Sequence, residues 1–224
     1  MTVEGLQGLW QRSLIAWPSR GASDTSTSVR WLQGPRAYID LRQPAPIPDF
    51  SHARTLEDLT YDDCAWLARQ EGFAGYLSFD GLHFEWLREI DFQPRSPSAD
   101  AGSLRWEDDV LIETGRDADY IEHWHRDPSI ATTPAASIDL QGRAYKTRAT
   151  LLRVGPHFMF ARARAASLDE GYGSLTEYVA AARDLAHARE LIDCEISFGR
   201  ADAAGLRITA STLPYRIGSL MELE

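Results

Sequence analysis

The stretch from Phe73 to Pro94, FAGYLSFDGLHFEWLREIDFQP, decides the fold class. Its two halves alternate apolar and polar side chains with a period of two, which is typical of half-buried β-strands. Asp80 and Gly81 lie between the halves, and this pair favours the tight turn of a β-hairpin. We therefore predict two antiparallel strands, Phe73–Phe79 and Leu82–Phe92.

Similar alternation recurs along the chain. Further strands are predicted over Gly8–Trp17, Ser28–Gln33, Arg36–Arg42, Ser103–Trp106, Val110–Thr114, Tyr120–Arg126, Ile138–Leu140, Ala144–Val154, His157–Arg164, Asp193–Gly199, Leu206–Ser211 and Tyr215–Leu223. Two helices are predicted, Leu56–Gln70 and Leu175–Leu191. Most strands follow one another through short turns, without the crossover helices that parallel pairing requires. The chain is therefore predicted to be all-β and antiparallel with two short helices. Two barrel-like halves are expected, residues 1–128 and 129–224, or one continuous domain.

Composition narrows the range of partners and compartments. The chain has 224 residues, with 23 basic and 33 acidic side chains and a formal net charge of −10. This charge argues against nucleic acid or an anionic membrane as the main partner. No apolar run reaches the roughly 18 residues of a membrane span, and the N-terminal residues do not look like a secretory signal, so the cytoplasm is expected. Cys64 and Cys194 are predicted to be two separate thiols.

The aromatic residues are distributed unevenly. All seven tryptophans lie in the first 124 residues: Trp10, Trp17, Trp31, Trp66, Trp86, Trp106 and Trp124. If the chain has a ligand pocket, we expect it in the first half.

Charged residues on otherwise apolar strand faces are the candidate site residues. Arg88 shares a face with Phe84, Trp86, Ile90 and Phe92, and a buried arginine needs an acidic partner because an unpaired charge in an apolar interior is very costly. A strand over Arg36–Arg42 offers one such acid.

That strand has a polar face of Tyr38, Asp40 and Arg42. This face is either solvated or, if the barrel holds a polar site, turned inward. The strand over Tyr120–Arg126 has a similar face that includes Glu122.

His123 and His125 point the same way on their predicted strand, a spacing that can bind zinc or iron. A third ligand is not singled out by spacing, and two surface histidines are the preferred interpretation. The chain has no G-x-S-x-G, Walker A or G-x-G-x-x-G pattern. We predict no metal and no cofactor.

The first strand resembles a known element. Gly8-Leu9-Trp10-Gln11-Arg12 is similar to the G-x-W element that begins the barrel of lipocalins and their calycin relatives. The resemblance implies that Trp10 plugs the closed end and that an arginine packs across its ring. Arg12 shares the face of Trp10 and can also pair with an acid on another strand.

A wider resemblance covers much of the chain. The segments GLWQRSLI, YIDLR, FAGYLSFDGLHFEWLREIDFQP, GSLRWEDDVLIETGRDADYIEHWHR and CEISFGR…GLRITASTLPYRIG resemble a family whose fungal members were named for interaction with a casein-kinase-type kinase. The resemblance implies two calycin-like barrels in one chain and no established activity.

Three functional hypotheses remain open. The first is a binding protein for a small apolar or amphipathic molecule, with ligand contacts from Trp10, Arg12, Trp31, Arg42, Phe84, Trp86, Arg88 and Phe92. The second is an isomerase, cyclase or dehydratase, whose candidate acid–base residues are Tyr38, Asp40, Glu122 and His123. The third is a protein-interaction module with exposed aromatic residues near Asp127–Ser137. The sequence predicts no oligomeric state.

Overall fold

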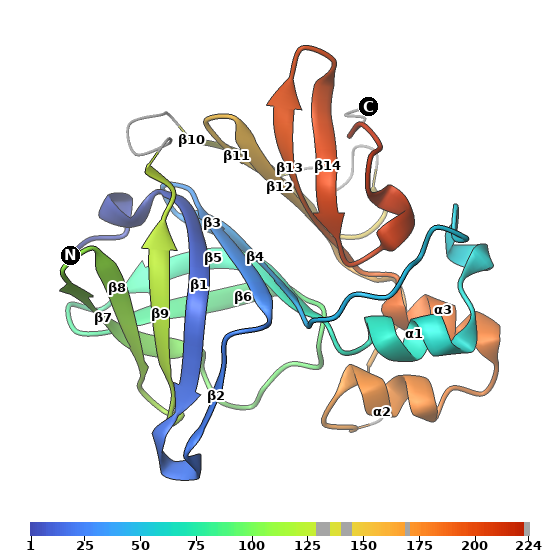
Figure 1. The fold of residues 1–224 in the computed structure, drawn as a ribbon, viewed down its shortest axis with the longest axis horizontal. Coiled ribbons are helices and arrows are strands. Elements are labelled where there is room, and N and C mark those ends of the chain that lie inside the picture. The colour runs from blue at the N-terminus through green and yellow to red at the C-terminus, as the bar shows by residue number, and fades with distance from the viewer. Residues whose placement is uncertain (129–134, 140–144, 169–170, 222–224) are drawn as a thin grey trace.

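The computed structural model describes residues 1–128, 135–139, 145–168 and 171–221, and it is mostly β with three short helices (Figure 1). In the first half the strands are β1 (Gly8–Trp17), β2 (Ala22–Asp24), β3 (Ser28–Gln33), β4 (Ala37–Gln43), β5 (Glu71–Phe79), β6 (Phe84–Asp91), β7 (Ala101–Glu107), β8 (Val110–Gly115) and β9 (Ile121–Arg126). In the second half they are β10 (Ala135–Asp139), β11 (Ala149–Val154), β12 (His157–Arg162), β13 (Glu195–Asp202) and β14 (Gly205–Ser211).

The first nine strands build a closed antiparallel barrel. Their order is β2-β1-β3-β4-β5-β6-β7-β8-β9, and a further pairing of β1 with β9 closes eight of them into a cylinder, with β2 added beside β1. Closure gives each of these eight strands two neighbours, although β6 and β7 pair only at Phe84–Gly102 and Glu85–Ala101. The interior is filled mainly by large side chains: Trp10, Val29, Trp31, Tyr38, Phe73, Leu77, Phe84, Trp86, Leu111 and Trp124. The predicted antiparallel all-β barrel fold is confirmed.

The second half is a five-stranded antiparallel sheet in the order β10-β11-β12-β13-β14. Within the described ranges no pairing joins β10 to β14, so this sheet is open. In Figure 1 it stands at the upper right of the barrel. The first strand of the sheet, β10, begins at Ala135, three residues before the strand predicted over Ile138–Leu140, and residues 129–134 are outside the described part of the chain.

Three helices form instead of the two predicted ones. The expected helix Leu56–Gln70 is shortened to α1 (Tyr61–Leu67), because Thr60 caps the helix by accepting a hydrogen bond from the Asp63 amide. The expected helix over Leu175–Leu191 is divided into α2 (Leu175–Ala180) and α3 (Leu185–Ile192). Asp184 begins α3 by accepting a hydrogen bond of 2.8 Å from the His187 amide. Short polar residues therefore restart helices that apolar spacing alone predicts to be continuous.

The C-terminal strand predicted over Tyr215–Leu223 does not form. Pro214–Arg216 is a 3₁₀ turn, and beyond it the chain pairs with β14 only through an isolated bridge between Arg207 and Leu220. Residues 222–223 lie outside the described part. No helix in the described residues is long and apolar enough to cross a bilayer.

A second hydrophobic core joins the two halves. β4 serves both cores, because Tyr38, Asp40 and Arg42 turn into the barrel while Ile39 and Leu41 face the second sheet. The helices α1, α2 and α3 pack into the same joining core (Figure 1). Cys64 and Cys194 are buried and free there, as predicted, and burial raises the pKa of each thiol to about 11.

Candidate functional site

The barrel contains an open cavity of about 180 Å³. Its aromatic lining comes from β3, β5, β6 and β9 with the residue before it: Trp31, Phe73, Trp86, Tyr120 and Trp124. Its charged lining is Asp40, Arg42, Arg88, Asp100, Glu113 and Glu122. We call this space the barrel cavity. Its lining combines flat rings with ionisable groups, as small-molecule sites commonly do.

Strand alternation on β4 places two charged side chains in the barrel. Asp40 is 2% exposed, and its Oδ1 lies 2.9 Å from Arg42 Nε. The Arg42 guanidinium also lies 5.1 Å from the centre of the Phe73 ring. Of the two alternatives for this face, the inward one is therefore correct. Burial raises the pKa of Asp40 to about 6, despite the adjacent Arg42.

Glu122 connects three strands through its carboxylate. Its Oε1 lies 2.5 Å from Arg12 Nη1 and 3.3 Å from Arg42 Nη1. Arg12 and Glu122 come from β1 and β9, the pair that closes the barrel. The prediction that Arg12 pairs with an acid on another strand is confirmed. Arg12 also lies 3.8 Å from Asp24.

The arginine across the Trp10 ring is Arg126. Its guanidinium carbon lies 5.5 Å from the ring centre, and its Nη2 donates a hydrogen bond to the Gln7 carbonyl. Arg126 is the direct cross-strand partner of Trp10 in the β1–β9 ladder. Arg12, which was expected in this role, instead turns to Glu122 because the buried carboxylate requires a cation.

Glu113 and Glu122 form a buried pair of carboxyl groups. They lie directly opposite each other on β8 and β9. Glu113 accepts hydrogen bonds from the Tyr120 hydroxyl at 2.8 Å and from Trp124 Nε1 at 3.0 Å. Burial, and then the charge of Glu122, raises the pKa of Glu113 well above its usual range. Burial and the same carboxyl groups also raise the pKa of Tyr120.

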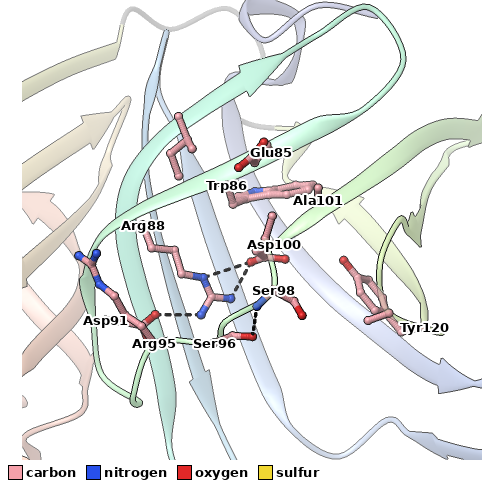
Figure 2. A pocket seen from close by; sticks show the side chains of 13 residues that line it. Glu85, Trp86, Arg88, Asp91, Arg95, Ser96, Ser98, Asp100, Ala101 and Tyr120 are labelled. Carbon is pink, nitrogen blue, oxygen red and sulfur yellow. Dashed lines mark hydrogen bonds and ion pairs between the residues drawn. The ribbon is translucent and has the colours of Figure 1, made fainter. Parts of the chain in front are cut away.

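Arg88 lies at the side of the barrel where β6 and β7 separate. These strands pair only at Phe84–Gly102 and Glu85–Ala101. Beyond that point Arg88 spans the opening, 3.0 Å from Asp91 and 2.6 Å from Asp100, as Figure 2 shows. Its guanidinium carbon also lies 3.6 Å from the centre of the Phe73 ring.

Asp91 and Asp100 are thus the acidic partners that burial of Arg88 required, and Asp40, the one option that the sequence offered, pairs with Arg42 instead. Burial disfavours the charge of Arg88, but the two carboxylates raise its pKa above the usual value.

An outer pocket of about 310 Å³ adjoins the barrel cavity at this opening. The two spaces share Trp86, Arg88, Asp100 and Tyr120. Figure 2 shows the Arg88–Asp100 pair with Tyr120 across from it. The Arg88–Asp100 ion pair therefore separates the interior from the outer pocket.

A β-bulge overturns the prediction for Phe92. Gly75 pairs with Arg88 but Ala74 pairs with Ile90, so Glu89 is an extra residue on β6. The bulge exchanges the two faces of the strand beyond Arg88. Phe92 consequently lies in the core that joins the halves, outside the barrel.

The other predicted residues fall into three groups. Those lining the barrel cavity are Trp31, Asp40, Arg42, Trp86, Arg88 and Glu122. Trp10, Tyr38 and Phe84 are buried within the barrel but do not line the cavity, and Arg12 lines a neighbouring space of about 200 Å³. The Tyr38 hydroxyl has no hydrogen-bond partner among the described residues. Whether these residues bind a ligand stays a prediction.

His123 lies outside this site. Glu122 and Trp124 turn inward, so His123 and His125 turn to the outer face of β9, where His125 Nε2 lies 2.9 Å from the Ser13 hydroxyl. In the described part of the chain no three His, Cys, Asp or Glu side chains gather as a metal site.

Three lining acids or phenols were not predicted as site residues. Glu113 shares a strand face with Leu111, two residues earlier, and Tyr120 shares a face with Glu122, two residues later, so the faces of both strands point to them. Asp100 lies in a stretch predicted as loop, which carries no periodic signal.

Comparisons with known proteins support the fold alone. No protein-family profile matches the sequence, and no curated protein matches it significantly. A solved structure with a similar fold is that of the uncharacterized protein YLR301w from Saccharomyces cerevisiae, with a TM-score of 0.51. The two proteins are 10% identical, and the similarity covers 91% of this chain and 84% of that one.

Proposed function

We propose that the protein binds a small amphipathic molecule in the barrel cavity, and that the polar end of this molecule is a cation. The observation that carries the proposal is the lining, in which aromatic rings adjoin more carboxyl groups than arginines. The ion-pair network of the interior contains three arginines, Arg12, Arg42 and Arg88. Of these, Arg42 and Arg88 line the cavity, together with four carboxyl groups: Asp40, Asp100, Glu113 and Glu122.

The arginines are already committed to protein carboxylates. Arg42 contacts Asp40 and Glu122, and Arg88 contacts Asp91 and Asp100. They are therefore poor candidates for holding an anionic ligand, because a ligand carboxylate would have to displace a protein carboxylate. An organic cation instead gains attraction from the surplus acids and from the faces of the aromatic rings.

Glu113 is the acid that responds most to such a ligand. Burial, followed by the charge of Glu122, raises its pKa well above the usual range, so its ionised form is disfavoured. A cation beside it favours its ionised form, so binding releases a proton. The affinity for an ammonium ligand is expected to rise with pH for this reason.

Calorimetric titration with benzylamine tests the proposal, with benzoate and benzyl alcohol as the anionic and neutral analogues. We expect benzylamine to bind most tightly and Glu113→Gln to weaken it about 10-fold, the effect of about one charge-assisted contact. Glu107→Gln is the matched control, since Glu107 is an exposed carboxylate of the same barrel, 57% exposed. Equal or tighter binding of benzoate would refute the proposal.

A second candidate function is acid–base catalysis in the same cavity. It is favoured because Asp40 and Glu122 converge on one cavity together with Glu113, and burial raises the pKa of Asp40 to about 6, close to neutral pH. Exchange of the α-protons of cyclohexanone in D₂O, followed by NMR, tests it. We expect exchange faster than in buffer and slower with Asp40→Asn; a rate equal to that of buffer excludes general-base chemistry on this probe.

The resemblance to calycin proteins remains a proposal. It is supported by the position of Gly8-Leu9-Trp10 at the start of the barrel and by the arginine across the Trp10 ring. The resemblance to the fungal kinase-interacting family likewise stays a proposal, as does a protein partner. The region expected to expose aromatic residues for such a partner, Asp127–Ser137, is mostly outside the described residues.

A further inference from the structure

A second cavity, of about 430 Å³, lies where the two halves of the chain meet. It is bordered by β3 and β4, by the chain between β4 and α1, by α1 and by β14 with the 3₁₀ turn that follows it. In Figure 1 the chain between β4 and α1 passes below the β13–β14 hairpin. We call this space the seam cavity and define it by Arg30, Phe50, Trp66, Tyr215 and Ile217.

One wall of the seam cavity is apolar and aromatic. The centres of the Phe50 and Trp66 rings lie 5.6 Å apart. Tyr215, which follows β14 in the sequence, also lines the cavity. Ile47 and Ile217 line the cavity yet remain 53% and 50% exposed. Exposed large aliphatic side chains beside a cavity of this size provide a surface for the apolar part of a ligand.

Arg30 is the cationic group of the cavity. It lies on the outer face of β3, opposite Leu41 of β4 in the ladder, and its guanidinium carbon is 5.2 Å from the centre of the Phe198 ring. Burial lowers the pKa of Arg30, and no carboxylate offsets this effect. In the described part of the chain its guanidinium has no hydrogen bond and no ion pair.

The remaining polar groups around Arg30 do not neutralise it. Among the described residues that line the cavity, Asp49 is the acidic one, and both of its carboxylate oxygens are engaged by Ser51 at a surface turn. Arg54 adds a second positive charge to the lining. The Ser28 hydroxyl, two residues before Arg30 on the same face of β3, has no hydrogen-bond partner within the described residues.

From these observations we infer that the seam cavity is a binding site for an amphipathic organic anion, a monocarboxylate with an apolar body. Its carboxylate pairs with the Arg30 guanidinium and accepts a hydrogen bond from Ser28. Its apolar body lies against Phe50, Trp66 and Tyr215. A guanidinium forms two parallel hydrogen bonds to a carboxylate, and a partly buried one is stabilised by gaining such a partner.

Calorimetric titration of the full chain with octanoate tests this site, with octylammonium and octan-1-ol as matched probes of opposite and zero charge. We expect octanoate to bind more tightly than either. Arg30→Gln should weaken octanoate binding about 10- to 100-fold, as expected for loss of hydrogen bonds to a charged group. It should leave octan-1-ol nearly unaffected, and Arg30→Lys should restore part of the octanoate affinity.

A second variant tests whether the ligand lies in the seam cavity and leaves Arg30 unchanged. Ile217→Asp adds a carboxylate at the exposed rim, so it should weaken octanoate and strengthen octylammonium. Leu82→Asp is the control, because Leu82 is 70% exposed on a distant hairpin turn and should have no effect.

Several results would overturn the inference. These are no octanoate binding, preference for octylammonium, wild-type octanoate affinity in Arg30→Gln, or wild-type affinity in Ile217→Asp. Octanoate that competes with benzylamine would place the anion in the barrel cavity and would also overturn it. Failure of benzylamine to bind leaves the octanoate result unaffected, so the two proposals fail separately.

Discussion

The arginines of the barrel and the arginine Arg30 of the seam cavity have different partners. Inside the barrel, Arg12, Arg42 and Arg88 each contact at least one buried or half-buried carboxylate. At the seam, Arg30 is also partly buried, but its guanidinium lies over the Phe198 ring and has no ion pair with any described residue. The paired arginines hold strands together across the barrel, whereas the unpaired one offers its hydrogen bonds to a ligand. The partner of a buried cation, more than its burial, therefore distinguishes a structural role from a binding role.

The largest expected effect comes from breaking a pair inside the barrel. Arg12→Leu should lower the free energy of unfolding by about 3–5 kcal/mol, because it leaves the Glu122 carboxylate buried without its closest cation. The Arg12 and Glu122 side chains are 6% and 2% exposed. Urea unfolding measures the change.

Arg105→Leu is the matched control, since Arg105 and Glu107 form an ion pair on the barrel surface with side chains 55% and 57% exposed. The control should have a much smaller effect. Equal effects of the two substitutions would contradict the distinction between buried and exposed pairs.

The second effect concerns the pH dependence of stability. The pKa of Asp40 rises from 3.8 in the unfolded chain to about 6 in the barrel, so the folded state holds this proton more tightly. Its contribution to stability is therefore greatest below about pH 4 and is lost as pH rises through 6, a total of about 3 kcal/mol.

The comparison of wild type with Asp40→Asn isolates this contribution. The difference between their unfolding free energies should shift against the wild type as pH rises from about 4 to 7 in urea titrations. A difference that does not vary with pH would show that Asp40 is not perturbed by burial.

The third effect tests the closed end of the barrel. Arg126→Met removes the cation over Trp10 and the hydrogen bond to the Gln7 carbonyl while keeping an unbranched side chain. We expect a loss of about 1–2 kcal/mol in the free energy of unfolding. Gln11→Met, on the neighbouring β1 position that is exposed, should cost less. An unchanged free energy of unfolding in Arg126→Met would show that the cation–π contact does not stabilise the closed end of the barrel.

The smallest effect is expected at the seam. Arg30→Met should change the free energy of unfolding by less than about 1 kcal/mol, because no carboxylate is left without a partner when the guanidinium is removed. The same chemical denaturation series measures it. A loss as large as that of Arg12→Leu would mean that Arg30 has a structural partner, and it would erase the contrast between the two cavities.

Strand periodicity in the sequence predicted many of the residues that line the barrel cavity. The alternation of Tyr38, Asp40 and Arg42 with Ile39 and Leu41 placed the polar set on one face. What periodicity could not decide is which face turns inward, because both faces of β4 are buried, one in each core. The polar face enters the barrel because Glu122 and Arg12 arrive there from β9 and β1, and those contacts are set by closure of the barrel.

Non-local and irregular features could not be predicted in this way. Asp100 comes from a loop that reaches Arg88 only because β6 and β7 separate. The seam cavity combines residues around position 50 with residues around position 215, which no local pattern connects. Thr60 and Asp184 are recognisable capping residues: Thr60 marks the start of α1, and Asp184 marks the division of the second predicted helix into α2 and α3.

The bulge on β6 has a consequence for how the chain tolerates changes in length. Because Glu89 is the one extra residue on β6, the side chains before it and those after it alternate in opposite phase between the barrel interior and the core that joins the halves. Deleting Glu89 would restore simple alternation and exchange every side chain beyond it: Ile90 would enter the barrel and Asp91 would enter the apolar core between the halves. A substitution on this strand alters the contacts of one side chain, whereas deletion of Glu89 would change the packing of both cores. The spacing from Arg88 to Ile90 is therefore under a stricter physical constraint than the identity of the residue between them.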